Sequence, residues 1–393
     1  MKDALKKHVL AALVPLLLPG IAAAQIHAMF NYETKSPDSL KALKTPVQTG
    51  PRKEGIAVID VDPDSKTFGQ TVQDIPLPPD LVAHHIFYNR DMSKGYVTAL
   101  GKGELRVMDM KKAPYTLKVV AVPDCAVGED IVFSEDNKHW YLSCMGSDAM
   151  VVGDAVTDKP IKTIKVAAKY PHGIAIHNGI DRILLTSTVR ASDLGDAGEV
   201  ISAVEASTGK VLGTYKVSKK PSPAGEAPVE ILFVPKSNPP VAYITNMFGG
   251  TLWAATWDPK KKDFTVAQVH DFNEQKIGVP LEMYFNAKGD RMYLTTAKPG
   301  HLHVFDTTDV NAPKLLKSYP AAEGAHHVAF TKDGRYAFVQ NALLNLPGMS
   351  DGSVTIVDLK ADKVVTSMDE LKNKGLNPNS MVLLPRWNDL AGH

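Results

Sequence analysis

The chain has 393 residues and is close to charge neutrality, with 44 lysines and arginines against 43 aspartates and glutamates. This balance provides no basic excess for binding nucleic acid or an anionic membrane surface, so neither partner is expected. The length is compatible with two domains or with one large β architecture, and the internal pattern has to decide between them.

The first 24 residues are typical of a secretory signal peptide (1–24). A lysine-rich start precedes a short apolar run over 9–18, and the small residues at 21–24 suit a cleavage site before Gln25. The apolar run is too short to cross a bilayer, and no later hydrophobic stretch reaches membrane length. We therefore expect an exported protein without membrane insertion, periplasmic or secreted, with one mature domain over 25–393.

A repeat of short apolar segments runs along the mature chain. Each segment opens with one or two polar or small residues and continues as a β-rich stretch, which a polar turn connects to a second one, as in a hairpin. Third and fourth β-rich stretches follow in most units, so each unit is predicted to be a four-stranded meander. The seven segments begin at His84, Glu129, His172, Val229, Leu281, His326 and Asn379.

The spacing of these segments identifies the fold class. Intervals of 43 to 57 residues match the blades of an all-β, seven-bladed β-propeller. The seventh unit runs out of chain soon after Leu384, whereas 55–60 has the pattern of a missing third strand. We therefore expect N-terminal strands to complete the last blade and close the ring. The Gly-, Pro-, Ser- or Asp-rich stretches 190–198, 221–227 and 343–352 are predicted to be loops within this single domain rather than linkers.

Histidines are concentrated at the starts of the predicted first strands, which line the central channel of a propeller. Two positions in each of seven repeats would hold fewer than one of the 13 histidines by chance. The sequence places five there: His84, His85, His172, His326 and His327. Several imidazoles favour copper, zinc, iron or nickel over calcium or magnesium, and copper binds most tightly among the divalent ions. We predict a metal centre, with copper as the leading candidate.

Three glutamates occupy the same phase of the repeat: Glu129, Glu230 and Glu282. They could ligate, orient a ligand imidazole or act as a general base, and Glu129 and Glu282 are the predicted catalytic residues. Successive side chains of a regular strand point to opposite faces, so His84 and His85 reach one ion only if the strand is irregular there. The alternative is a channel whose histidines are satisfied by water and backbone carbonyls.

The remaining candidates are weaker. The histidines at 139, 177, 270, 301 and 303 fall in predicted turns or outer strands, where an exposed histidine needs no functional explanation. Cys125 and Cys144 are the only cysteines. Their spacing matches no thiolate metal motif, and an exported protein favours a disulfide between them over a copper thiolate, although the sequence leaves both open.

The order of several motifs resembles the selenium-binding protein family, whose bacterial members include copper-dependent methanethiol oxidases. The similar stretches are VIDVDPDS at 58–65, GEVI at 198–201, PLEMYF at 280–285, GSV at 352–354 and GLNPN at 375–379. The doubled histidines and the Pro-His-Gly motif also look like the copper propellers of nitrous-oxide reductase and thiocyanate dehydrogenase. Many selenium-binding proteins carry paired cysteines soon after the doubled histidine, where this chain has FYNRD at 87–91, so selenium binding is not implied.

The family resemblance implies a seven-bladed propeller with copper held by His84, His85 and His172, and with His326 and His327 as further ligands. The leading functional expectation is a copper-dependent oxidoreductase acting on a small sulfur compound such as a thiol, with a redox protein as a further partner. A non-catalytic exported propeller that binds a protein or a metal is one alternative. A lactonase-like, metal-dependent hydrolase is another, although its channel would be expected to be rich in Glu, Asp and Asn rather than His.

Overall fold

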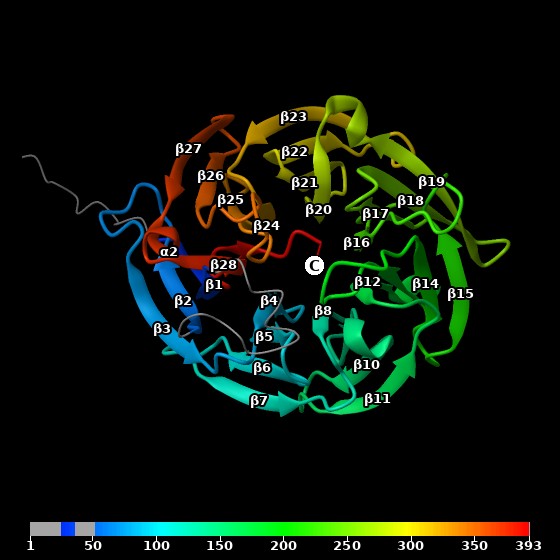
Figure 1. Cartoon of the computed structure of the whole chain (residues 1–393), viewed down its shortest axis with the longest axis horizontal. Coiled ribbons are helices and arrows are strands. Elements are labelled where there is room, and N and C mark those ends of the chain that lie inside the picture. The colour runs from blue at the N-terminus through cyan, green and yellow to red at the C-terminus, as the bar shows by residue number, and fades with distance from the viewer. Residues whose placement is uncertain (1–24, 36–51, 393) are drawn as a thin grey trace, which may run out of the picture.

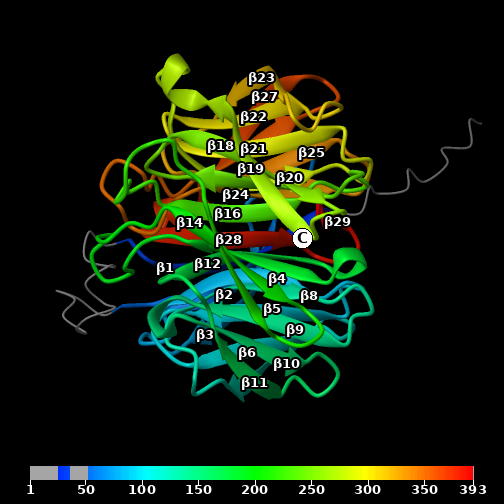
Figure 2. The ribbon, with the colours of Figure 1, turned by 90° about the vertical axis from the view of Figure 1, so that its right-hand side faces the viewer.

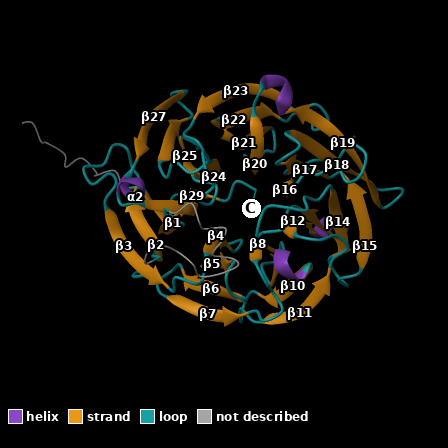
Figure 3. Ribbon diagram, viewed as in Figure 1, coloured by secondary structure: helices purple, strands orange, loops and turns teal. Residues whose placement is uncertain are grey.

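The computed structural model describes residues 25–35 and 52–392, so the predicted signal peptide lies outside the described residues. The strands form seven small sheets around a central axis, as a seven-bladed β-propeller (Figures 1 and 3). The predicted fold class is confirmed. Within the described ranges, no helix combines the length and apolar character needed to cross a membrane.

Each blade has four strands, listed here from the axis outward. Blades one to three comprise β4 (Ala83–Tyr88), β5 (Lys94–Ala99), β6 (Glu104–Asp109) and β7 (Leu117–Ala121); β8 (Gly128–Phe133), β9 (His139–Cys144), β10 (Ala149–Asp154) and β11 (Pro160–Lys165); and β12 (Pro171–His177), β13 (Arg182–Ser187), β14 (Val200–Glu205) and β15 (Val211–Lys216). Blades four to six comprise β16 (Pro228–Phe233), β17 (Val241–Asn246), β18 (Thr251–Asp258) and β19 (Asp263–Asp271); β20 (Gly278–Phe285), β21 (Arg291–Lys298), β22 (Gly300–Asp306) and β23 (Lys314–Pro320); and β24 (Ala325–Thr331), β25 (Tyr336–Asn341), β26 (Val354–Asp358) and β27 (Lys363–Met368). Short helical turns at Met145–Ser147, Asn178–Ile180, Phe272–Gln275 and α2 (Glu370–Asn373) connect some of the strands.

The seventh blade joins the two ends of the chain. Its inner strand is β28 (Leu376–Leu383), followed outward by β1 (His27–Thr34), β2 (Glu54–Asp60) and β3 (Thr71–Leu77). Strands β1 and β28 are antiparallel, with Met29 opposite Val382. The prediction that N-terminal strands complete the last blade is therefore confirmed, and the stretch predicted as its third strand is β2.

The hydrophobic core is divided into layers between neighbouring blades, because the two faces of each sheet pack against the sheets on either side. Between blades one and two, for example, Tyr96 and Leu105 pack with Ile131 and the fully buried Trp140. Equivalent apolar clusters occupy the other six junctions of the ring. Figure 2 shows the ring turned by 90°, with the sheets stacked side by side.

A β-bulge recurs on the inner strand of blades one to six. In β4, His84 and His85 together face the single residue Thr98, because Ala83 pairs with Ala99 and Ile86 pairs with Val97. A bulge re-aims side chains, so consecutive residues need not point to opposite faces of the sheet. The equivalent bulge pairs are Glu129-Asp130, His172-Gly173, Val229-Glu230, Leu281-Glu282 and His326-His327. The seven predicted segments thus all lie on inner strands, and their opening residues are the bulge residues in blades one to six.

Polar side chains on the second strand support these bulges. The backbone N–H of the second bulge residue donates to the side chain opposite it: His85 to Thr98 Oγ1 at 3.1 Å, and His327 to Gln340 Oε1 at 3.1 Å. Thr245 accepts from Glu230 in the same way at 3.2 Å, and its hydroxyl donates to the carbonyl of Leu281 in the next blade at 2.8 Å. One buried side chain therefore fixes a bulge and joins two blades.

The backbone also takes a strained conformation two residues before each of these bulges. Val82, Val127, Tyr170, Ala227 and Val279 have φ between 51° and 59°, and Gly324 has φ 91°. A left-handed conformation is costly for valine, typically about 1–3 kcal/mol, and persists only where the surrounding structure imposes it. Hydrogen bonds help to impose it, as when the Leu100 N–H donates to the Val82 carbonyl at 3.0 Å. Strain is thus concentrated around the start of the channel-lining strands.

Cys125 and Cys144 form a disulfide bond beside the bulge of blade two. Both residues are buried, and they are separated by 19 positions in the sequence. Closing a loop of this length limits the freedom of the unfolded chain, so we expect the Cys125→Ala/Cys144→Ala variant to be about 2–4 kcal/mol less stable. Urea unfolding of both proteins would measure this difference. Equal midpoints would show that the bond adds nothing to stability.

Candidate metal centre

The five predicted histidines all reach the central channel, where they separate into two groups. His84 and His172 meet Glu129 in what we call the first cluster. His85, His326 and His327 form the second cluster. In each group, one potential ligand atom per residue lies within 4.8 Å of the others. The bulge in β4 accounts for this arrangement, because it brings the stacked rings of His84 and His85 to the channel while each joins a different cluster.

The first cluster has spacings that suit a metal ion. Glu129 Oε2 lies 3.0 Å from His84 Nε2 and 3.5 Å from His172 Nε2. Nitrogen and oxygen ligands at about 2.1 Å from a tetrahedral ion are separated from each other by roughly 3.4 Å. All three side chains are at least nine-tenths buried. The cluster therefore needs little rearrangement to hold an ion.

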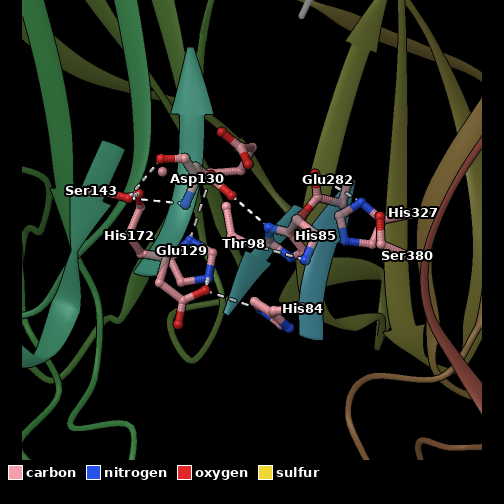
Figure 4. A network of polar contacts seen from close by, with 12 residues as sticks. His84, His85, Thr98, Glu129, Asp130, Ser143, His172, Glu282, His327 and Ser380 are labelled. Carbon is pink, nitrogen blue, oxygen red and sulfur yellow. Dashed lines mark hydrogen bonds and ion pairs between the residues drawn. The ribbon is translucent and has the colours of Figure 1, made fainter. Parts of the chain in front are cut away.

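The second cluster is oriented by Asp130. Asp130 Oδ1 lies 2.7 Å from His85 Nδ1, within the polar network shown in Figure 4. If this carboxylate accepts the Nδ1 proton, the ligating nitrogen of His85 is Nε2, as in many carboxylate-oriented metal ligands. The ring centroids of His85 and His327 are 4.4 Å apart. Sequence analysis did not single out Asp130, although its place as the second bulge residue after Glu129 is a signal that could have identified it.

Glu282 belongs to the second cluster rather than the first. Its carboxylate oxygens lie 3.3 Å from His326 Nε2 and 3.8 Å from His327 Nδ1. The Tyr284 hydroxyl lies 3.4 Å from the same Nδ1 and accepts a hydrogen bond from the Val328 N–H. The two predicted catalytic carboxylates thus lie in different places, with Glu129 in the first cluster and Glu282 beside the second.

The channel buries a large excess of acidic groups. Glu129, Asp130, Glu230 and Glu282 are each at most 3 % exposed, and the bulge pairs of blades one to six contain no lysine or arginine. Burial, followed by the charge of Asp130, raises the pKa of Glu282 to about 8. Burial and the charges of Asp130 and Glu282 also raise the pKa of Glu230 well above its usual range. A cation in the channel would relieve this repulsion.

The histidines respond to the same environment in different ways. For His84, burial opposes protonation, but Glu129 and then the other carboxylates outweigh burial and raise its pKa. For His326, burial and the nearby His84 and His172 lower the pKa to about 3. His326 is therefore neutral at physiological pH, which is the form that ligates a metal.

The two mouths of the channel are different. At the end where the inner strands begin, a pocket of about 920 Å³, including its open part, contains His84, Glu129, His172 and His326 in its lining. At the opposite end, the C-terminal segment lies near the axis, where β29 (Asn388–Asp389) pairs with β24 (Figure 1). This segment borders a smaller cavity with Glu282, Tyr284 and His327. A ligand approaching from the wider pocket therefore meets the first cluster.

The histidines outside the channel join neither cluster. His303 differs from the expectation of an exposed side chain, because it is fully buried in β22. Its two ring nitrogens lie 3.0 Å from Thr296 Oγ1 and 2.7 Å from Ser318 Oγ. Burial, with a smaller contribution from His301 and His270, lowers its pKa to about 3. A neutral, hydrogen-bonded imidazole of this kind is part of the blade interior.

Comparison with known proteins identifies the fold. The sequence matches no protein-family profile and no curated protein. A hypothetical selenium-binding protein from Sulfolobus tokodaii superimposes with a TM-score of 0.72 at 11% identity, over 93% of this chain and 95% of that one. Hydrazine synthase from Kuenenia stuttgartiensis has a TM-score of 0.57 at 17% identity, over 79% and 92%. A putative 6-phosphogluconolactonase from Bacteroides uniformis has a TM-score of 0.56 at 11% identity, over 91% and 99%. At these identities the likeness is one of fold, and function depends on the site.

Proposed function

We propose that this chain is an exported, copper-dependent oxidoreductase acting on a sulfur compound such as a thiol. The observation that carries the proposal is the first cluster, a histidine, carboxylate and histidine set within the lining of a largely apolar pocket. The donor set fits copper, because imidazole nitrogens suit Cu(II) and the buried carboxylates favour a cation. The predicted signal peptide supports export.

His84 and His172 would hold the ion, with Glu129 close to both, and His85, His326 and His327 provide a second set of ligands. Bound copper would supply a Lewis-acidic centre that exchanges single electrons. Asp130 holds His85 in one orientation, and the apolar wall keeps water from the reacting thiol, which strengthens electrostatic interactions within the pocket.

Glu129 is the better candidate for the base. It is the one carboxylate among the described residues that line the pocket, whereas Glu282 borders the cavity at the opposite mouth. Oxidation of two thiols to one disulfide releases two protons and two electrons. Glu129 would accept a thiol proton, and dioxygen or an exported redox protein would accept the electrons.

The test is thiol oxidation by protein reconstituted with Cu(II). We expect loss of free thiol and uptake of dioxygen by the wild type, and roughly a 100-fold lower kcat/KM in Glu129→Gln, because a positioned base typically contributes at least that factor. Copper content measured in parallel separates loss of the base from loss of the ion. Copper-loaded wild type that leaves thiols unoxidised, with dioxygen or with an added redox protein, would contradict the proposed function and favour a protein that only binds metal.

A further inference from the structure

The pocket above the first cluster is larger and more apolar than a methyl-sized substrate requires. Its volume of about 920 Å³, including the open part, lies in the range of sites for drug-sized molecules. Fifteen of its 20 lining residues are apolar, and they come from blades one to six. The histidines and Glu129 lie on the inner strands, so the polar groups gather at the channel end of an apolar funnel.

The wall is built by inserted loops. The repeats that begin at His172 and His326 are among the longest, and their extra residues include the stretches 188–198 and 342–352. Leu194, Leu344 and Leu346, from these two stretches, line the pocket. Hydrogen bonds hold the second stretch in place, with the Leu343 N–H donating to the Met349 carbonyl at 2.8 Å. The apolar wall is therefore preformed.

One polar side chain interrupts the wall. The position that follows the second strand holds Leu100, Met145 and Met247 in blades one, two and four, and Thr188 in blade three. Thr188 is 1 % exposed and lines the pocket, and its hydroxyl has no hydrogen-bond partner among the described residues. Leaving a buried hydroxyl unpaired is costly, which points to a ligand group that pairs with it.

We propose that the pocket binds a thiol with an apolar body of roughly six to ten carbon atoms, whose head lies at the first cluster within reach of Thr188. This assignment rests on the proposed function for the identity of the head, whereas recognition of the body depends on the wall alone. Phe248, which is 49% exposed and lines the pocket, would then be covered by the bound ligand.

The experiment compares ethanethiol, butanethiol and hexanethiol by anaerobic calorimetry, with metal-free and with copper-loaded protein. Each buried methylene should strengthen binding by roughly fourfold in both forms, from its transfer free energy of about 0.8 kcal/mol. Ala191 lines the pocket without belonging to either cluster. Ala191→Trp should weaken hexanethiol binding more than tenfold while leaving copper content unchanged, and Thr188→Val should weaken every thiol by about fivefold to tenfold.

Ala126→Trp is the matched control, because Ala126 is exposed and does not line the pocket. An affinity that does not change with chain length, or that Ala191→Trp leaves intact, would overturn the proposal even if the protein oxidised methanethiol. Chain-length dependence in a protein that binds no copper would support the pocket assignment and contradict the proposed oxidoreductase.

Discussion

A variant in which His84, His85 and His172 are replaced by alanine is expected to bind Cu(II) roughly 100-fold more weakly or not at all. The substitutions remove two of the three ligands of the first cluster and one of the second. The effect should be at least as large as the 10- to 100-fold loss that follows removal of groups that merely orient a metal ligand. Metal content after dialysis against a competing chelator measures the difference.

The control for this variant removes three histidines outside the channel, His139, His177 and His301, which belong to neither cluster. It should retain wild-type copper and the same far-ultraviolet circular dichroism. Two double variants, His84→Ala/His172→Ala and His326→Ala/His327→Ala, then show which cluster holds the ion. If the triple variant stays folded and keeps stoichiometric copper, the channel is not the metal centre.

Replacing Arg52 with methionine is expected to reduce the free energy of unfolding by about 3–5 kcal/mol at pH 8, because removal of one partner leaves buried charge uncompensated. Glu33 of β1 and Glu54 of β2 are buried directly opposite each other. Arg52 lies between them, 2.6 Å from Glu33 Oε2 and 2.8 Å from Glu54 Oε1. Glu54 also accepts hydrogen bonds from the N–H groups of Val82 and Ala83, so this network joins the last blade to the first.

The cost of this substitution should depend on pH. Burial raises the pKa of Glu54 to about 7, although Arg52 acts in the opposite direction. A carboxyl whose pKa is raised in the folded state favours folding at low pH, and this contribution is lost as the pH rises through about 7. Without Arg52 the carboxyl binds its proton more readily, so the penalty should be largest above pH 7 and smaller at pH 5.

Urea unfolding at pH 5 and pH 8 measures this pH dependence. Lys53→Met is the matched control, because it removes the same charge from the adjacent, exposed residue, and it should change stability by less than about 0.5 kcal/mol. A penalty for Arg52→Met that is equal at both pH values would show that Glu54 does not change protonation in this range.

The amino-acid sequence by itself determined the fold class, the number of blades and the closure of the ring. These features follow from the order of apolar and turn residues, because a meander that repeats every 43 to 57 residues cannot bury its faces except against its neighbours. It also brought the five histidines to one channel, since the inner strand of every blade lies next to the axis. Gln25 as the start of the mature chain and the export of the protein remain predictions, because 1–24 lies outside the described residues.

Only the tertiary structure decided how the channel residues are grouped. Alternation along a regular strand would send His84 and His85 to opposite faces, and the bulge opposite Thr98 overrides it. Val82 takes a left-handed conformation that no local sequence signal predicts, because packing and hydrogen bonds across the blade impose it. Asp130 meets His85, and the loops of blades three and six converge into one apolar wall, only when the ring is closed. These contacts join residues far apart in the chain, and their geometry depends on the closed ring rather than on any local pattern.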